Sequence, residues 1–525
     1  MNTTQEIGAD SAAQTTGASD LPQTLRYGQT TIQKKKEIPI PFENYDAVFA
    51  LLALVCGYLF VWLINPYNLG LGVTLFTVVF CGIVLFYAKK RGVPISRQSN
   101  GYLALILLSA LNFSLFSNVS LQFLNLLFLM GCAAYWVAVL ASTRLEKSLG
   151  GYFLPDMMNQ LFKVPFYNFG CAVKIIKGTA VKNKKSKMLL TSLCGALAAI
   201  PLICVVISLL IQADAAFQSV MQQVTESIGV QFANFLLRLL PAFLTGSYLF
   251  GLLYGNLQKR RVDTITAEKA ANFSQRCKKL PAAASITALC LLCGVYLFFF
   301  GTQTASLFSA FSNQRPDGIT YAEYARRGFF ELCKVAFINL GVTMVSSIFT
   351  VRNDREQHKV LRIVNVVLSV ETLLLIATAI SKMVMYIDRY GLTQKRVYTS
   401  WFMVLLFIVF CMLIVSQFKK INLTKNIVVA FAVCFMLLCY SNVDGIIVKY
   451  NIGRYQNGTL QTVDVNMMYN APDASKPYAL ELYHHTEDLQ LKAELKEFLQ
   501  GQNKNVQPFQ EINLQQLLAR HLDVQ

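Results

Sequence analysis

Four ionisable side chains lie inside long apolar runs of the sequence, where no water would solvate them. Glu331 and Lys334 are one helical turn apart in one run, and Glu371 and Lys382 lie in the next. Charges inside membrane-spanning segments are costly, and they usually face a protein interior or a wet cavity. The four residues therefore form a candidate intramembrane charge network that could bind an ion, a proton or a lipid headgroup.

The order of the charges along these two runs predicts an ion pair. A short loop joins the runs, so we expect two antiparallel neighbouring helices. Glu331 and Lys382 would then lie at similar depth, and a pair would satisfy both charges. Such a pair could be an inert clamp that fixes helix packing, or it could line a polar path. The sequence leaves both interpretations open.

The elements that would position these charges are membrane-spanning helices. The chain has 525 residues, of which 54% are hydrophobic and 14% charged, and this excludes a soluble multidomain enzyme and wholesale disorder. Apolar runs long enough to cross the hydrocarbon recur along most of it. The sequence predicts an all-α polytopic transmembrane helix bundle of about eleven spans, over residues 45–64, 71–88, 101–116, 121–142, 189–211, 235–257, 282–301, 328–349, 363–386, 398–416 and 426–440.

The distribution of charge predicts which helix ends face the cytoplasm. The loops 89–97, 143–188, 258–280, 350–362 and 417–425 hold 27 Lys and Arg residues against 6 acids, whereas the intervening loops hold 6 against 5. Lys and Arg gather in cytoplasmic loops, so the net charge of +18 does not call for a nucleic-acid partner. The resulting topology has a disordered cytoplasmic extension (1–44), a transmembrane domain (45–440) and a polar extracytoplasmic C-terminal domain (441–525).

The basic loop 143–188 has the pattern of an amphipathic helix. Apolar residues such as Phe162 and Phe166 recur at helical spacing, and Lys163, Lys174 and Lys177 flank them. A helix on the inner membrane surface would place the phenylalanines in the acyl boundary and the lysines among anionic headgroups. A helix packed on the protein's own membrane domain fits equally well. The expected partners are the lipid bilayer and its anionic lipids at the cytoplasmic face.

The C-terminal region has the pattern of a small helical domain. The sequence Thr486-Glu487-Asp488 can cap a helix that ends before Gly501, and Asn513 can cap a short last helix. The adjacent His484 and His485 lack a third ligand at helical spacing, so we expect ordinary surface residues and no metal site.

A second candidate site is a polar cluster at the predicted outer ends of the helices. The segments YAEYARRG, RYGLTQKR and NVDGIIVKYNIGRY fall there, together with an aspartate after the fifth helix. Arginine offers paired donors that suit an anionic group such as phosphate, although Tyr and Arg also form belts of interfacial anchors. The candidate residues are Asp214, Tyr321, Glu323, Arg326, Arg327, Arg389, Arg396, Asp444, Lys449 and Arg454.

Three motifs, in this order, resemble an uncharacterised bacterial membrane family, the domain of unknown function DUF4173, and its close sister DUF4153. They are YAEYARRGFFELCKVAFIN (321–339), MYIDRYGLTQKR (385–396) and SNVDGIIVKYNIGRY (441–455), and the stretch QADAAF (212–217) is similar as well. The resemblance covers about residues 45–470. It implies a multi-pass protein of a bacterial cell membrane, and it implies no activity.

Familiar catalytic patterns such as GxxxxGK[ST], HExxH and GxSxG do not occur in the chain. We therefore predict no catalytic residue and no cofactor, and an enzyme ranks fourth, behind three other function classes. Three function classes remain. The first is transport or handling of an ion, a lipid or another anionic small molecule by the charged helices. The second is a membrane sensor or signalling partner, and the third is a non-catalytic membrane scaffold.

Overall fold

The computed structural model describes residues 40–146, 148–181, 184–224, 230–262, 266–302, 321–351, 354–501 and 508–522. Residues 42–525 form one compact unit, and the other unit, residues 1–41, is described only at its last two positions. Most of the predicted N-terminal extension (1–44) thus lies outside the described residues.

Nine described helices are long and apolar enough to cross a membrane. Together with the absence of strands in the described residues, they confirm an all-α polytopic bundle. They are α1 (Asn44–Leu63), α2 (Leu71–Lys90), α4 (Val119–Ala141), α10 (Val230–Leu257), α12 (Ala282–Thr302), α14 (Tyr321–Phe349), α15 (Arg355–Tyr390), α16 (Gln394–Phe418) and α17 (Leu423–Tyr440).

Two further predicted spans, α3 (Arg97–Leu115) and α8 (Lys184–Ala213), do not belong to these nine. Polar side chains lower the hydropathy of α3, but they face its neighbour α4. The Ser109 hydroxyl donates to Asn125 Oδ1 at 2.7 Å, and the Trp136 indole donates to Ser99 Oγ at 2.9 Å. α3 therefore packs between α2 and α4 with its polar face toward the bundle, while Leu107, Leu108 and Leu111 stay exposed on its other face.

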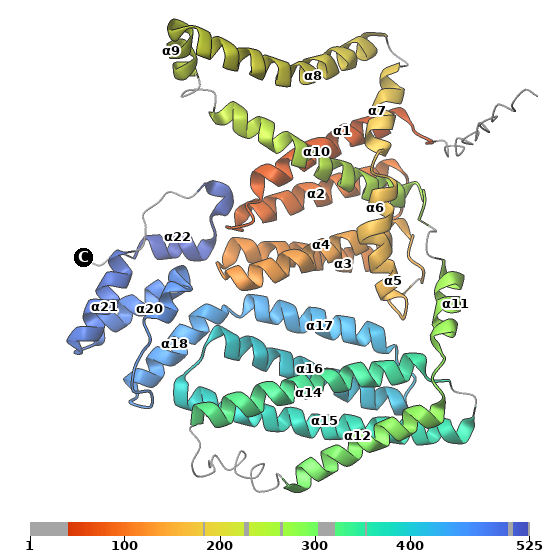
Figure 1. Ribbon diagram of the computed structural model, residues 1–525, viewed down its shortest axis with the longest axis vertical. Coiled ribbons are helices and arrows are strands. Elements are labelled where there is room, and N and C mark those ends of the chain that lie inside the picture. The colour runs from red at the N-terminus through yellow and green to blue at the C-terminus, as the bar shows by residue number, and fades with distance from the viewer. Residues whose placement is uncertain are drawn as a thin grey trace, which may run out of the picture. The chain divides into compact units, whose positions relative to one another are not determined.

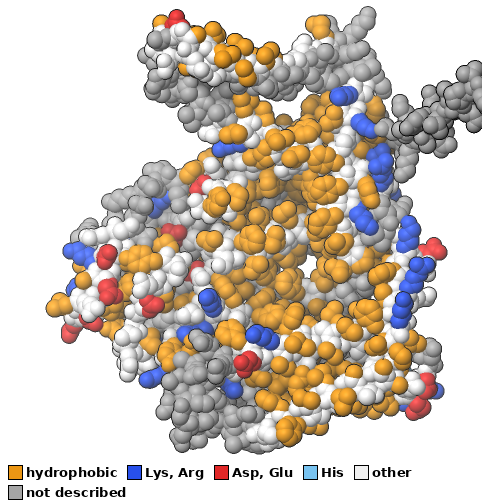
Figure 2. All heavy atoms as spheres, viewed as in Figure 1, with side chains coloured by type: hydrophobic (Ala, Val, Ile, Leu, Met, Phe, Trp, Pro, Cys, Tyr) orange, Lys and Arg blue, Asp and Glu red, His pale blue; other side chains and the backbone are white. Residues whose placement is uncertain are grey.

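The helices form two groups (Figure 1). In the first, α1 packs on α10 and α2, and α2, α3 and α4 follow side by side. In the second, α15 packs against α12, α14 and α16. The groups meet where α17 contacts α3 and α4. Apolar side chains cover most of the face seen in Figure 2, and a row of Lys and Arg runs along one edge.

We call that edge of the bundle the basic end. The helix ends there are joined by contacts between distant segments: the Leu280 amide donates to Phe349 O at 3.0 Å, and the Asn422 side chain donates to Leu149 O at 2.9 Å. We call the opposite edge, from which the C-terminal helices extend, the tail end. These two names describe the fold and leave open which side of the membrane each end faces.

A buried ion pair links α1 to α2 at the basic end. Asp46 is fully buried, and its carboxylate accepts two hydrogen bonds from the Arg91 guanidinium, at 2.5 and 2.6 Å, and one from the Tyr87 hydroxyl at 2.8 Å. Glu43 lies 3.4 Å from the same arginine but is largely exposed. Because the buried Asp46 carboxylate is paired with the Arg91 guanidinium, this ion pair fastens α1 to α2, the first helical hairpin of the bundle.

Replacing Asp46 by Asn should lower the melting temperature of the detergent-solubilised protein markedly. Removal of one partner leaves Arg91 with an uncompensated charge, an effect on the order of 3–5 kcal/mol. Glu43→Gln is the matched control, because an exposed pair contributes only about 0–1 kcal/mol. Equal shifts for the two variants in a thermal unfolding assay would contradict the anchoring role of Asp46.

The connector after α4 packs against the bundle. It comprises α5 (Phe153–Met158), the π-helix η1 (Asn159–Lys163), α6 (Val164–Tyr167) and α7 (Cys171–Val181). Val164, Cys171 and Ile175 are buried, and α6 and α7 contact α10 and α1. Phe162 and Phe166 nevertheless remain exposed. Packing on the membrane domain, one of the two alternatives, is therefore observed, while the opposite apolar face stays uncovered by protein.

The C-terminal region folds into helices that close over the tail end. They are α18 (Val443–Gln456), α19 (Asn466–Tyr469), α20 (Pro472–His485), α21 (Leu489–Gln500) and α22 (Leu514–Arg520). The predicted caps at Asp488 and Asn513 are confirmed. The buried Glu511 accepts hydrogen bonds from the side chains of Asn65 (2.9 Å) and Asn68 (3.1 Å), which ties this region to the α1–α2 turn.

Candidate functional site

The predicted pair between Glu331 and Lys382 is not formed. Glu331 and Lys334 are exposed on the outer face of α14, whereas the Lys382 amine lies against Gly328 on the packed face of that helix. The prediction considered how deep the two residues lie in the membrane, but not which face of its helix each side chain occupies. Because the two faces differ, the side chains do not meet. Near the ends of the apolar segment, exposed charged side chains can extend toward the membrane–water interface, which lowers their cost.

Glu371 is the predicted network residue that the structure does bury. It lies near the middle of the 36-residue helix α15, about 24 Å along the helix from its first residue and about 28 Å from its last. Its side chain is 4% exposed, and neither carboxylate oxygen has a hydrogen-bond partner in the described part of the chain. The Cys293 thiol of α12 is close enough to interact with it. No described Lys or Arg forms an ion pair with it.

Neutral polar groups of three helices surround this carboxyl. The Tyr296 hydroxyl of α12 donates to Asn339 Oδ1 of α14 at 2.7 Å. The Asn339 amide in turn donates to the Thr372 hydroxyl of α15 at 2.9 Å. Thr372 is the residue next to Glu371, so the chain Tyr296–Asn339–Thr372 runs beside the acid. These hydrogen bonds between buried polar groups hold α12, α14 and α15 in one arrangement, and Glu371 lies between the helices beside them.

Further polar residues continue from this chain toward the basic end. We call this set the polar seam; it consists of buried side chains between α14, α15 and α12. Its members are Asn339, Thr343 and Ser346 on α14, Thr350 directly after α14, Asn365, Ser369 and Thr372 on α15, and Ser285 on α12. The sequence analysis missed the seam, although the first four recur at spacings of four, three and four, which is the pattern of one helix face.

Four of the ten residues of the predicted outer polar cluster, Asp214, Arg396, Asp444 and Arg454, cap or join helices. Asp214 caps α9 (Ala215–Val224) by accepting from the amides of Ala216 and Phe217, at 2.7 and 2.9 Å. Arg389 and Lys449 are exposed. The side chains of four other candidates, in the first two turns of α14, lie outside the described residues: Tyr321, Glu323, Arg326 and Arg327.

The remaining candidates hold helix ends together. Arg396 donates to the carbonyl oxygens of Tyr390 and Gly391 at the end of α15. Arg454 reaches Asp388 Oδ1 at 3.3 Å.

Asp444 is buried and accepts hydrogen bonds from Asn118 (2.8 Å) and Gln394 (2.7 Å), which links α18 to the bundle; burial raises the pKa of its carboxyl. None of Arg396, Arg454 and Asp444 is arranged to hold a free anion.

The turn between α15 and α16 is fixed by one residue of α18. The Asn451 side chain accepts from the Leu392 amide at 2.7 Å and donates to the Leu392 carbonyl at 2.9 Å. Gly391 adopts φ +74°, and a Cβ there would clash with Asn451 Oδ1. Only glycine fits this turn without strain.

Gly391→Ala should therefore destabilise the protein, by about 1–3 kcal/mol, since both the backbone and the contact are incompatible with a side chain. Gly453→Ala is the matched control, because an added Cβ there meets no atom within 4 Å and the residue is helical. Thermal unfolding of the two variants measures the difference. A loss of similar size in Gly453→Ala would show that α18 tolerates no change, rather than that the turn needs glycine.

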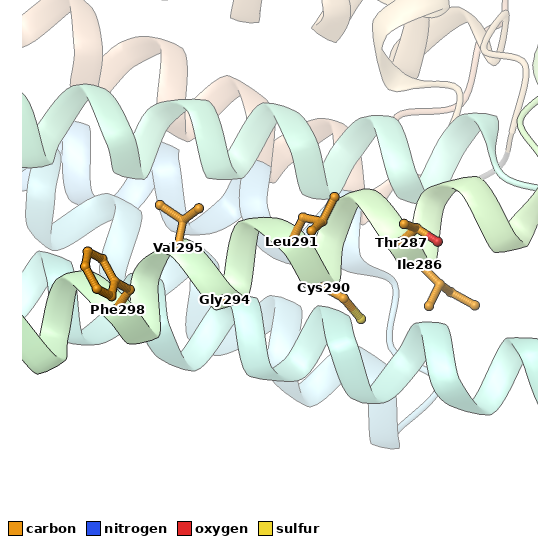
Figure 3. A pocket seen from close by; sticks show the side chains of 7 residues that line it. All are labelled: Ile286, Thr287, Cys290, Leu291, Gly294, Val295 and Phe298. Carbon is orange, nitrogen blue, oxygen red and sulfur yellow. The ribbon is translucent and has the colours of Figure 1, made fainter.

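An apolar hollow of about 600 Å³ lies on the outer face of α12 (Figure 3). All seven lining residues come from this one helix: Ile286, Thr287, Cys290, Leu291, Gly294, Val295 and Phe298. The hollow lies on the side of α12 away from Cys293 and Tyr296, and it contains no ionisable group apart from a thiol. It offers no chemistry beyond apolar contact, so Glu371 and the polar seam are the candidate site.

One comparison with known proteins gives a match. The model of a family described as a domain of unknown function (DUF4153) matches residues 103–482. The chain belongs to the DUF4153 family. No curated protein and no solved structure matches it. The matched segment of this DUF4153 protein includes α12, α14 and α15, and hence Glu371 and the polar seam. In the described residues no group of three His, Cys, Asp or Glu side chains could hold a metal ion.

Proposed function

We propose that this integral membrane protein moves protons, alone or together with a solute, and that Glu371 is the group that binds the proton. The observation that carries the proposal is a mid-helix carboxyl that is 4% exposed, has no ion-pair partner among the described residues, and has the Cys293 thiol, a weak donor, as its hydrogen-bonding neighbour. Ionisable residues at membrane depth commonly belong to proton relays and ion paths.

The surroundings of Glu371 favour a proton over a metal cation. A lone carboxylate in an apolar interior is strongly disfavoured unless its charge is neutralised, and a proton neutralises it without further ligands. A bound metal ion needs several oxygen ligands around it. The described neighbours offer one carboxyl, one thiol, and hydroxyl and amide groups that already bond to each other.

An anionic substrate is less well supported. Two arginines of the tail end, Arg396 and Arg454, could hold a phosphate or carboxylate, but they already bond to backbone carbonyls, to Asp388 or to Thr459.

The proposal also includes membership of the narrower family DUF4173 and a place in a bacterial cell membrane, with the basic end on the cytoplasmic side. Both rest on the three sequence motifs and on the charge of the loops.

Glu371→Gln should leave the fold about as stable as the wild type, because the carboxyl gives up no ion pair and the amide oxygen of glutamine can still accept from the Cys293 thiol. A hydrophobic carbodiimide, which reacts with protonated carboxyls in apolar surroundings, should label Glu371 in the membrane-embedded wild type. The label would be located by mass spectrometry of the proteolytic peptides and should disappear in Glu371→Gln.

Asp46 is the internal control for this labelling. It is buried as well, but its carboxylate is bonded to the Arg91 guanidinium, which shields it from the reagent. Labelling of Glu371 that is no faster than that of Asp46 would contradict the proposal. So would a large loss of stability in Glu371→Gln, since it would identify Glu371 as a structural residue.

We also propose that the exposed face of the connector (residues 153–181) lies on anionic lipid. Leu154, Phe162 and Phe166 are exposed beside Lys174 and Lys177, which are exposed as well. Large apolar side chains next to lysines suit the boundary between acyl chains and negatively charged headgroups. Each such lysine contributes about 1 kcal/mol near an anionic surface.

In nanodiscs, the wild type should melt at a higher temperature with phosphatidylglycerol than with phosphatidylcholine, and the gain should shrink at high salt. The double variant Lys174→Gln/Lys177→Gln should lose most of that gain. The matched control is Lys419→Gln/Lys420→Gln, two exposed lysines at the α16–α17 turn. An equal gain in wild type, variant and control would contradict a lipid contact at the connector.

A further inference from the structure

We propose that Glu371 exchanges its proton with the basic end of the bundle, through a gap between Ser346 and Asn365 that holds water. The inference rests on the proposed function, and it assigns the route and its direction. Three observations carry it: the register of α14 against α15, two unpartnered polar atoms, and the apolar packing on the other side of Glu371.

Two contacts fix the register of these antiparallel helices. Asn339 bonds to Thr372, and Lys382 lies against Gly328. Each step along α14 therefore corresponds to one step back along α15. Two helical turns correspond to about seven residues. Counting seven residues forward on α14 leads from Asn339 to Ser346, and counting seven residues back on α15 leads from Thr372 to Asn365. Ser346 and Asn365 thus lie opposite each other in the seam, on the basic side of Glu371.

Both of these residues carry a buried polar atom without a partner. Their side chains are each 4% exposed, and neither Ser346 Oγ nor Asn365 Oδ1 has a hydrogen-bond partner in the described part of the chain. A donor and an acceptor facing each other in this state are suited to a bridging water, which needs several polar partners. One turn nearer the basic end, the hydroxyls of Ser285 and Thr350 bond to each other at 2.7 Å.

On the tail side of Glu371 the same helices pack with apolar side chains. Seven buried residues on this side of α14 and α15 belong to one apolar cluster, which also includes Leu361 and Leu368 on the basic side: Phe329, Leu332, Ala336, Leu375, Ile376, Ala379 and Met383. Thr378 lies among the seven, but its hydroxyl bonds to its own helix, at Leu374 O, and the Lys382 amine lies beside Gly328. The two buried seam atoms without a hydrogen-bond partner among the described residues, Ser346 Oγ and Asn365 Oδ1, lie on the basic side of Glu371, so the proposed exchange of the proton uses that side.

The test is the rate of hydrogen–deuterium exchange at the Glu371 carboxyl, in the full-length protein in lipid. Infrared difference spectroscopy detects the carbonyl band of a protonated carboxyl, which Glu371→Gln assigns, and the band shifts on deuteration. Ser346→Ala/Asn365→Leu replaces both polar groups by apolar ones and should slow the shift by about tenfold or more. Thr378→Val, an isosteric change on the tail side, should leave the rate unchanged.

The possible outcomes separate the two proposals. If no band is lost in Glu371→Gln, the carboxyl is not protonated, and both the proposed function and this route are overturned. If the band is present but exchanges at the wild-type rate in the double variant, or slows in Thr378→Val instead, the route alone is overturned. Should the double variant fail to fold, Asn365→Leu alone carries the test with a smaller slowing in the same direction.

Discussion

Hydrocarbon offers no hydrogen bonds, so every polar group at membrane depth must find its partner on a neighbouring helix. This constraint accounts for most of the interior of the bundle. Ser109 and Asn125 join α3 to α4, Asn339 and Thr372 join α14 to α15, and Asp46 and Arg91 join α1 to α2. The buried carboxyl of Glu371 is an exception, because no described Lys or Arg forms an ion pair with it. A role other than holding the helices together accounts for this exception.

The same constraint applies to both groups of helices. In the first group, donors and acceptors of α3 and α4 satisfy each other or nearby carbonyls, whereas Ser247 Oγ of α10 has no hydrogen-bond partner among the described residues. In the second, Ser346, Asn365 and Glu371 all lie in one seam and retain atoms without a hydrogen-bond partner in that part of the chain. Each such atom costs free energy when it is buried without a bond. Their grouping in one seam with an ionisable residue favours a working role for α14 and α15.

Much of the fold could be predicted from the sequence, because hydropathy over about 20 residues is a strong signal. Nine predicted spans recur as long apolar helices, and α3 was detected despite its polar residues. Glu371 was identified as a candidate because a charge inside an apolar run is conspicuous. The caps at Asp488 and Asn513 were also readable, since capping depends on local sequence alone.

The face that each charge occupies could not be predicted. Glu331 and Lys382 match in depth, but the register and rotation of α14 and α15 decide which side chains meet, and these depend on packing between distant residues. For the same reason the arginines and aspartates of the three motifs were interpreted as a surface site. Arg396, Asp444 and Arg454 instead bond to helix ends and turns that are far apart in sequence.

The central claim, that protons cross the bundle by way of Glu371, is tested most directly by proton flux into proteoliposomes. A potassium gradient with valinomycin would set a membrane potential, and a trapped pH-sensitive dye would report the flux. The account predicts a flux above that of protein-free vesicles for the wild type, and its loss in Glu371→Gln at equal protein content. Equal flux in the two preparations, or no flux above the protein-free background in the wild type, would contradict it.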